Sequence, residues 1–125
     1  MFNIYSKIKT FIIRHAWLGE FFVFAVMLVL YLPLQAGESF ADPDSFYHLK
    51  MAELIAASGP IRNFIWLPFT TLAQAFADHH FLYHVLLIPF IKVLGPFPGI
   101  KASTAVFAAA AIAGLAWSMR ALREA

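Results

Sequence analysis

The chain has 125 residues, of which 62% are hydrophobic and 13% are charged. Soluble domains are roughly half apolar and about a quarter charged, so these proportions argue against a cytosolic globular protein. The chain has no cysteine, which excludes disulfides, thiolate metal sites and thiol nucleophiles. Its net charge of +2 is small and no basic stripe is interleaved with aromatic residues, so we predict no nucleic-acid partner.

The first part of the chain predicts a basic cytoplasmic segment over residues 1–16 and a transmembrane helix over residues 17–36. Residues 21–34 include ten Phe, Val and Leu side chains, each of which favours insertion by about 0.3–0.6 kcal/mol. Three basic residues precede this stretch, with no acidic residue before Glu20: Lys7, Lys9 and Arg14. The positive-inside rule therefore places the N-terminus in the cytoplasm. A cleaved signal peptide ending near Ala36 is the alternative.

Residues 37–80 are expected to form an external loop. They hold five acidic residues against two basic ones, which fits a translocated segment. The run Asp42-Pro43-Asp44-Ser45 is typical of a helix start, and Ser58-Gly59-Pro60 is typical of a helix end. A second short helix is predicted to begin at Thr71, with Gln74 completing a capping box.

Two further apolar stretches predict two more spans, so the expected fold is an all-α polytopic membrane protein with three transmembrane helices. Residues 81–94 carry His, Pro and Lys, and a re-entrant or interfacial helix is the alternative there. Residues 95–101 are rich in Gly and Pro and predict a cytoplasmic turn. Residues 102–119 contain eight Ala, so this span depends on close packing against other helices.

The charges at the C-terminal end conflict with three spans. An odd number of crossings places Arg120 and Arg123 outside, against the positive-inside rule. We therefore expect residues 120–125 to mark a truncation within a longer protein. The expected location is a bacterial inner membrane, with residues 37–80 periplasmic or external.

Residues able to support chemistry gather in the loop and at its junction with the next apolar stretch: Asp42, Asp44, His48, Asp78, His79, His80 and His84. Asp44 and His48 are four residues apart, as are His80 and His84, so each pair can project from one helical face. Two such pairs predict a divalent-cation site. Carboxylates favour Mg²⁺ or Mn²⁺, whereas imidazoles favour zinc, copper or haem iron. Capping alone is a sufficient explanation for Asp42.

The run Asp44-Ser45-Phe46-Tyr47-His48-Leu49-Lys50, followed by Gly59 and then Trp66-Leu67-Pro68, resembles the start of the oligosaccharyltransferase catalytic subunit and related GT-C glycosyltransferases. In that family a first span enters from the cytoplasm, and a long outer loop follows. This loop carries an Asp, an aromatic pair, a polar residue and a basic residue, then a Gly and a Trp-x-Pro element. The interval to Gly59 selects Asp44 as the counterpart of the family's Asp. The family's acceptor-recognition motif WWDYG is absent.

The resemblance implies an enzyme that moves sugar from a polyprenyl-phosphate or pyrophosphate donor to a protein, lipid or glycan acceptor on the outer face. Asp44 would be catalytic and would bind Mg²⁺ or Mn²⁺. The further metal candidates are Asp42, His48, Asp78, His79 and His80. Lys50 and Arg62 are candidates for the donor phosphate, and Arg62 can bind it in a bidentate manner.

Two other classes of function stay open from the sequence. A small non-enzymatic membrane protein can bind metal or haem through its histidines, or join a complex through its Ala-rich span. A transporter fragment is the other, but charged groups of transporters lie deep in the spans, and here most candidates lie in the loop.

Overall fold

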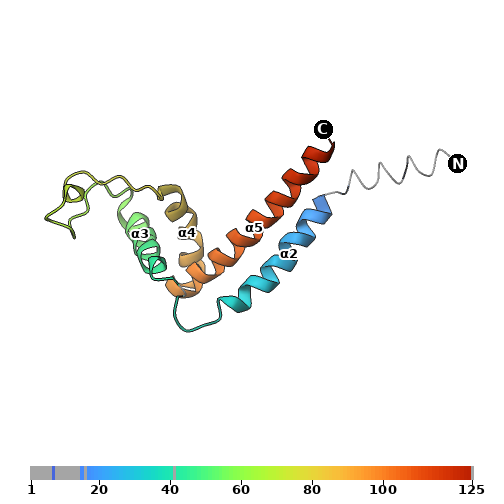
Figure 1. Ribbon diagram of the computed structural model, residues 1–125. Helices are drawn as coiled ribbons and strands as arrows, with labels where there is room; N and C mark the ends of the chain where they lie inside the picture. Colours follow the sequence, from blue (N-terminus) through green and yellow to red (C-terminus); the bar gives the residue numbers. More distant parts are fainter. Residues whose placement is uncertain (1–6, 8–14, 16, 41, 125) are drawn as a thin grey trace. The chain divides into compact units, whose positions relative to one another are not determined.

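The computed structural model describes residues 7, 15, 17–40 and 42–124. Its elements are α2 (Trp17–Leu34), α3 (Asp44–Ser58), the 3-10 helix η1 (Thr71–Ala73), α4 (Phe81–Leu94) and α5 (Pro96–Glu124) (Figure 1). The described residues contain no strand, so the all-α prediction is confirmed for them. The predicted cytoplasmic segment 1–16 lies outside the described residues except for Lys7 and His15.

The chain divides into two compact units, residues 1–36 with 104–125 and residues 37–103. Two helices are long and apolar enough to cross a membrane, α2 and the stretch Pro96–Arg123 of α5. None of the 18 residues of α2, all of which are described, is buried. A helix that is apolar on nearly every side and buries none of its residues is typical of a segment that faces lipid.

Helix α4 has the bounds that the apolar pattern predicts, but it is shorter than a full span. Its 14 residues extend about 21 Å at 1.5 Å per residue, compared with a hydrocarbon core of about 30 Å. The structure therefore offers two helices of spanning length in its described part, where the sequence predicted three spans.

Helix α3 begins within one residue of the predicted start and ends where the sequence predicts, at Gly59. The Asp42 carboxylate accepts a hydrogen bond from the backbone N–H of Asp44 at 3.0 Å, although Pro43 is the residue that immediately precedes the helix. At the other end Gly59 adopts φ 76°, and its N–H donates to the carbonyl of Ile55 at 2.9 Å. Glycine is favoured there because other residues rarely adopt positive φ.

The predicted turn over residues 95–101 is reduced to one residue. Gly95 has φ 88° and separates α4 from α5, which already begins at Pro96. Proline suits the first turn of a helix because the N–H that it lacks has no partner inside the helix at that position. The Gly- and Pro-rich segment 95–101, which the sequence predicts to interrupt helical structure, therefore ends α4 and starts α5.

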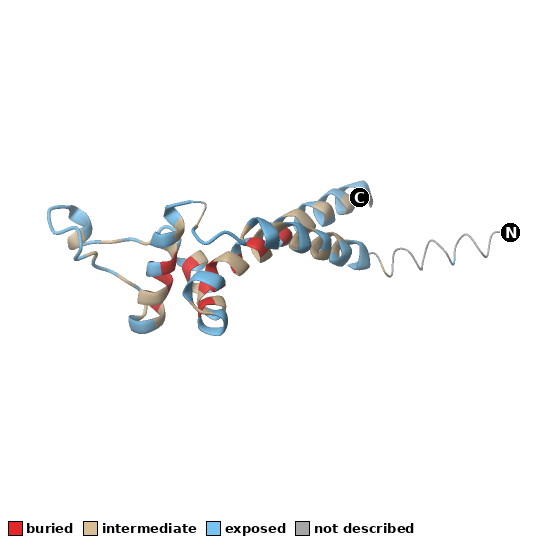
Figure 2. Cartoon of the chain, turned by 90° about the horizontal axis from the view of Figure 1, so that it is seen from below, coloured by how far each residue is buried: buried red, intermediate tan, exposed pale blue. Residues whose placement is uncertain are grey.

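Helices α3 and α4 pack side by side and provide most of the core of unit 37–103 (Figures 1 and 2). Its largest fully buried side chains are Met51, His84, Leu87, Ile100 and Ser103. The first turns of α5 join this core because Gly99 lies against the backbone of Phe90 and Ile91. Two of these five buried side chains are polar, and a buried polar group needs a hydrogen-bonding partner.

The segment between α3 and α4 folds back on itself. The N–H of Phe64 donates to the carbonyl of Leu72, and the N–H of Phe76 donates to that of Arg62, both at 2.8 Å. The rings of Phe64 and Phe76 lie 5.0 Å apart. The predicted capping box at Thr71 is not formed, since η1 has no side-chain cap and spans only three residues.

Candidate functional site

A row of three polar side chains lies between α3 and α4. The Asp78 carboxylate Oδ2 is 2.6 Å from Nδ1 of His84, and Nε2 of His84 is 2.8 Å from Nδ1 of His48. The side chain of His84 is 0% exposed and that of Asp78 is 5% exposed. A polar group this deeply buried is retained only where its hydrogen bonds are satisfied, and both nitrogens of His84 are.

Local structure explains why these side chains meet. Asp78 lies at the start of α4, where its Oδ1 accepts the N–H of His80 at 2.9 Å and its carbonyl accepts that of Phe81 at 3.3 Å. The N–H of His84 then donates to the carbonyl of His80 at 2.9 Å, as the predicted four-residue spacing requires. Packing of α3 against α4 brings His48 onto the far nitrogen of His84.

Aromatic rings surround His48. Its ring centroid lies 5.3 Å from that of His80 and 5.1 Å from that of Tyr83, both at nearly right angles. Tyr47 contacts the same group, with its ring 5.7 Å from that of His84. This setting partly shields the His48 imidazole from water while leaving it half-exposed.

The surroundings keep His48 neutral. Burial lowers the pKa of His48 below its ordinary value of 6.5, and the nearby His84 and His80 lower it further. Asp44 and Asp42 oppose this effect by raising the pKa of His48. Burial, followed by the charge of Asp78, raises the pKa of Tyr47 above 10.0, so this phenol keeps its proton at neutral pH.

The remaining predicted site residues form no hydrogen bond with the row that the structure records. Asp44 is exposed in the first turn of α3, one turn before His48, and Asp42 is exposed just before the helix; both lie near enough to raise the pKa of His48. His79 is exposed, and so is Arg62. Lys50 forms a surface ion pair with Glu53 at 3.2 Å, and its side chain is 66% exposed.

The side chains of this region are not arranged to hold a metal ion. Among the described residues, no group of three or more His, Asp or Glu is placed for that purpose. Both nitrogens of His84 and both oxygens of Asp78 are used in hydrogen bonds within the site. The predicted Mg²⁺ or Mn²⁺ is thus without structural support, and no step proposed below passes through a metal.

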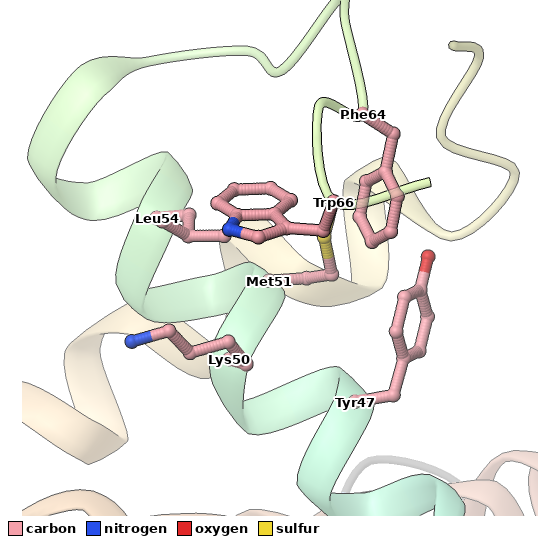
Figure 3. Close-up of a pocket in the computed structure, with 6 residues that line it drawn as sticks. All are labelled: Tyr47, Lys50, Met51, Leu54, Phe64 and Trp66. Carbon is pink, nitrogen blue, oxygen red and sulfur yellow. The ribbon is translucent and has the colours of Figure 1, made fainter. Parts of the chain in front are cut away.

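A cavity of about 300 Å³ opens on the neighbouring face of α3. It is lined by Tyr47, Lys50, Met51, Leu54, Phe64 and Trp66. Figure 3 shows the Trp66 indole over Met51 and Leu54, the Tyr47 hydroxyl directed toward Phe64, and the Lys50 side chain extending away from Tyr47. Tyr47 therefore belongs both to this cavity and to the surroundings of His48 and His84.

Sequence reasoning paired His84 with His80 in a predicted cation site but did not predict its contacts with Asp78 and His48. Its signal was its position inside an apolar stretch, where an unpaired imidazole is costly. Tyr47 was part of the resemblance motif, and nothing in the sequence tied it to the histidines.

Comparisons of the chain with models of protein families, with curated proteins and with solved structures found no match.

Proposed function

We propose that this chain belongs to a membrane glycosyltransferase of the GT-C type. It transfers sugar from a polyprenyl-phosphate or pyrophosphate donor to an acceptor on the outer face of the membrane. One observation carries the proposal. An exposed carboxylate, Asp44, follows the apolar helix α2 in the sequence and stands one helical turn from a half-buried imidazole, His48, which is hydrogen-bonded to a buried histidine.

The chemistry of sugar transfer needs these two groups. An acceptor hydroxyl must be oriented and must lose its proton, which a carboxylate or a neutral imidazole can accept. The donor phosphate leaves with negative charge, for which a cation is useful. Asp44 is proposed to bind and orient the acceptor, and Lys50 and Arg62 remain the proposed contacts of the phosphate.

An ion pair in unit 1–36 with 104–125 supports a specific orientation. Oε1 of Glu20, in the first turn of α2, lies 2.5 Å from Nη1 of Arg120, near the end of α5. This contact is what two helices that run in opposite directions would make. If α4 crossed the membrane completely, α5 would run parallel to α2, and Arg120 would lie about 30 Å from Glu20.

We therefore propose two crossings, by α2 and α5, with α4 as the re-entrant or interfacial helix. Residues 35–95 then lie on the non-cytoplasmic side. Arg120 and Arg123 lie in the cytoplasm with Lys7, so the conflict with the positive-inside rule disappears.

The test is a transfer assay on membranes that contain the full-length protein. Release of polyprenyl phosphate from a synthetic short-chain polyprenyl-phosphate hexose is measured for the unmodified protein and for Asp44→Asn. We expect a loss of about 100-fold or more for Asp44→Asn, as for removal of a group that acts in the transition state. Glu38→Gln removes an exposed carboxylate from the same loop and is the control. Equal rates for Asp44→Asn and Glu38→Gln contradict the proposal.

Haem or metal binding through histidines is one of the other functions that the sequence left open. It is not favoured by the geometry, because His84 already uses both ring nitrogens within the protein. A purified protein with a Soret absorption band that disappears in His80→Ala would nevertheless establish it.

A further inference from the structure

The order of hydrogen bonds in the row Asp78–His84–His48 fixes where the protons lie when Asp78 is ionised and both imidazoles are neutral. An ionised carboxylate only accepts hydrogen bonds, so Nδ1 of His84 must carry the proton that is directed at Asp78. In a neutral imidazole the other nitrogen is then an acceptor, which makes Nε2 of His84 the acceptor for Nδ1–H of His48. Nε2 of His48 is left with a lone pair.

His48 ends the row on the helix whose first turn carries Asp44, and it is partly exposed, whereas the side chain of His84 is fully buried. A lone pair at this position is suited to a hydroxyl group, because a hydroxyl donates a hydrogen bond and an imidazole nitrogen accepts it.

We propose that Asp78 and His84 are positioning residues that hold His48 in its Nδ1–H tautomer, and that Nε2 of His48 accepts the hydrogen bond and then the proton of the acceptor hydroxyl. This proposal rests on the proposed sugar transfer and assigns His48 as its catalytic base. Asp44, one turn away, orients the same hydroxyl-bearing acceptor.

The step balances with the groups named. The acceptor oxygen forms a bond to the anomeric carbon of the donor sugar, and the hydroxyl proton passes to Nε2 of His48. The bond between the anomeric carbon and the phosphate oxygen breaks, and the polyprenyl phosphate leaves with the electron pair. When His48 takes this proton, its Nδ1 proton can shift to Nε2 of His84, which places the positive charge beside the Asp78 carboxylate.

The first test reads the tautomer and needs no substrate. The chain has only five histidines, so imidazole ¹⁵N signals of the full-length protein in lipid nanodiscs can be assigned by single substitutions. We expect His48 and His84 each to carry the proton on Nδ1 at pH 7.5. Asp78→Ala removes the acceptor and should convert both rings to mixtures of tautomers. Gln74→Ala, at an exposed position in the same loop, should leave them unchanged.

The second test reads catalysis. His48→Gln should lower the transfer rate by about 10²- to 10⁴-fold, the usual range for a general base, without a change in KM. Asp78→Ala should lower the transfer rate by roughly 10-fold or more, because the His48 ring is no longer held in one orientation. The loss of rate should follow the loss of the Nδ1–H tautomer of His48.

The outcomes separate the two proposals. A His48 proton on Nε2, or tautomer populations that do not change in Asp78→Ala, would overturn the positioning role of Asp78 and His84. This holds whether or not the protein transfers sugar. The expected tautomers with full transfer by His48→Gln would overturn the role of His48 as base while sugar transfer stands. The expected tautomers in a protein that transfers no sugar would instead overturn the proposed function, and with it the hydroxyl substrate.

Discussion

Glu20 and Arg120, one hundred positions apart in the sequence, form an ion pair with Oε1 and Nη1 2.5 Å apart. Each charge also suits its own helix, since Glu20 lies in the first turn of α2 and Arg120 lies near the end of α5. The pair joins the N-terminal end of one apolar helix to the C-terminal end of the other. That relationship is the basis of the two-crossing arrangement.

The first prediction concerns the strength of this pair. Glu20→Gln and Arg120→Gln should each lower the free energy of unfolding in detergent micelles by up to about 1 kcal/mol, because the side chains are 19% and 32% exposed. The double variant should lose clearly less than the sum of the two single losses. Arg123→Gln, at an exposed position of the same helix end, is the control. Its loss and that of Glu20→Gln should add, with no measurable interaction energy between them. Additive losses at 20 and 120 would contradict the pairing.

The second prediction concerns the contact between α4 and the start of α5. A Cβ atom at Gly99 would lie 2.7 Å from both the Ile91 Cα and the Phe90 carbonyl oxygen. Gly99→Ala must therefore displace backbone, and we expect a loss of about 1–3 kcal/mol in the free energy of unfolding.

Gly114→Ala is the matched control for that substitution, because a Cβ there meets no atom within 4 Å. In the interior of α5, alanine should be neutral or stabilising by up to about 1 kcal/mol. The melting temperatures of the two variants give the comparison. A Gly99→Ala protein as stable as the Gly114→Ala protein would show that the two helices do not approach this closely.

The third prediction concerns pH. Because burial and neighbouring histidines lower the pKa of His48 in the folded protein, protonation of His48 favours the unfolded chain. The free energy of unfolding should therefore fall as the pH drops through about 6.5, the ordinary value for histidine, and level off below the lowered pKa of the folded state. Melting temperatures between pH 7.5 and pH 5 measure this effect.

His48→Gln should flatten that dependence, and His79→Gln, at an exposed position, should leave it unchanged. The titratable groups near His48 come from both sides of the row. Tyr47 and Asp44 belong to α3, and Asp42 precedes that helix. On the other side are His80, Tyr83 and His84, with Asp78 behind His84. Asp44 and Asp42 work against the predicted slope, so Asp44→Asn should steepen it. A melting temperature that rises toward pH 5 in the unmodified protein would show that the sign is wrong.

Residues that start and end helices made much of the fold predictable from the sequence. The bounds of α3 follow from Asp42, Pro43 and Gly59, and those of α4 follow from an apolar run closed by Gly95. The start of α5 was misplaced because a proline after a glycine is equally compatible with a turn and with the first position of a helix. The number of crossings stays a prediction, because apolar composition alone does not distinguish a short 14-residue helix such as α4 from a helix that crosses the membrane.

The site was predictable only in part. Spacing paired His80 with His84 and Asp44 with His48, since residues four apart share a helical face. The contact between His48 and His84 joins residues 36 positions apart and arises from the packing of α3 on α4. No local pattern reports such a contact, so the sequence led to a shared metal where the structure has a row of hydrogen bonds.

The fourth prediction is the sidedness of the chain, and its measurement tests the central claim most directly. The protein has no cysteine, so single cysteines can be introduced at Ser58, Pro98 and Ala121, all exposed, and treated with a membrane-impermeant maleimide in intact cells. Two crossings predict labelling of Ser58→Cys and Pro98→Cys in intact cells and of Ala121→Cys only after permeabilisation. Labelling of Ala121→Cys but not Pro98→Cys in intact cells would restore three crossings. Protection of Ser58→Cys would place Asp44 and His48 on the cytoplasmic face and contradict the proposed function.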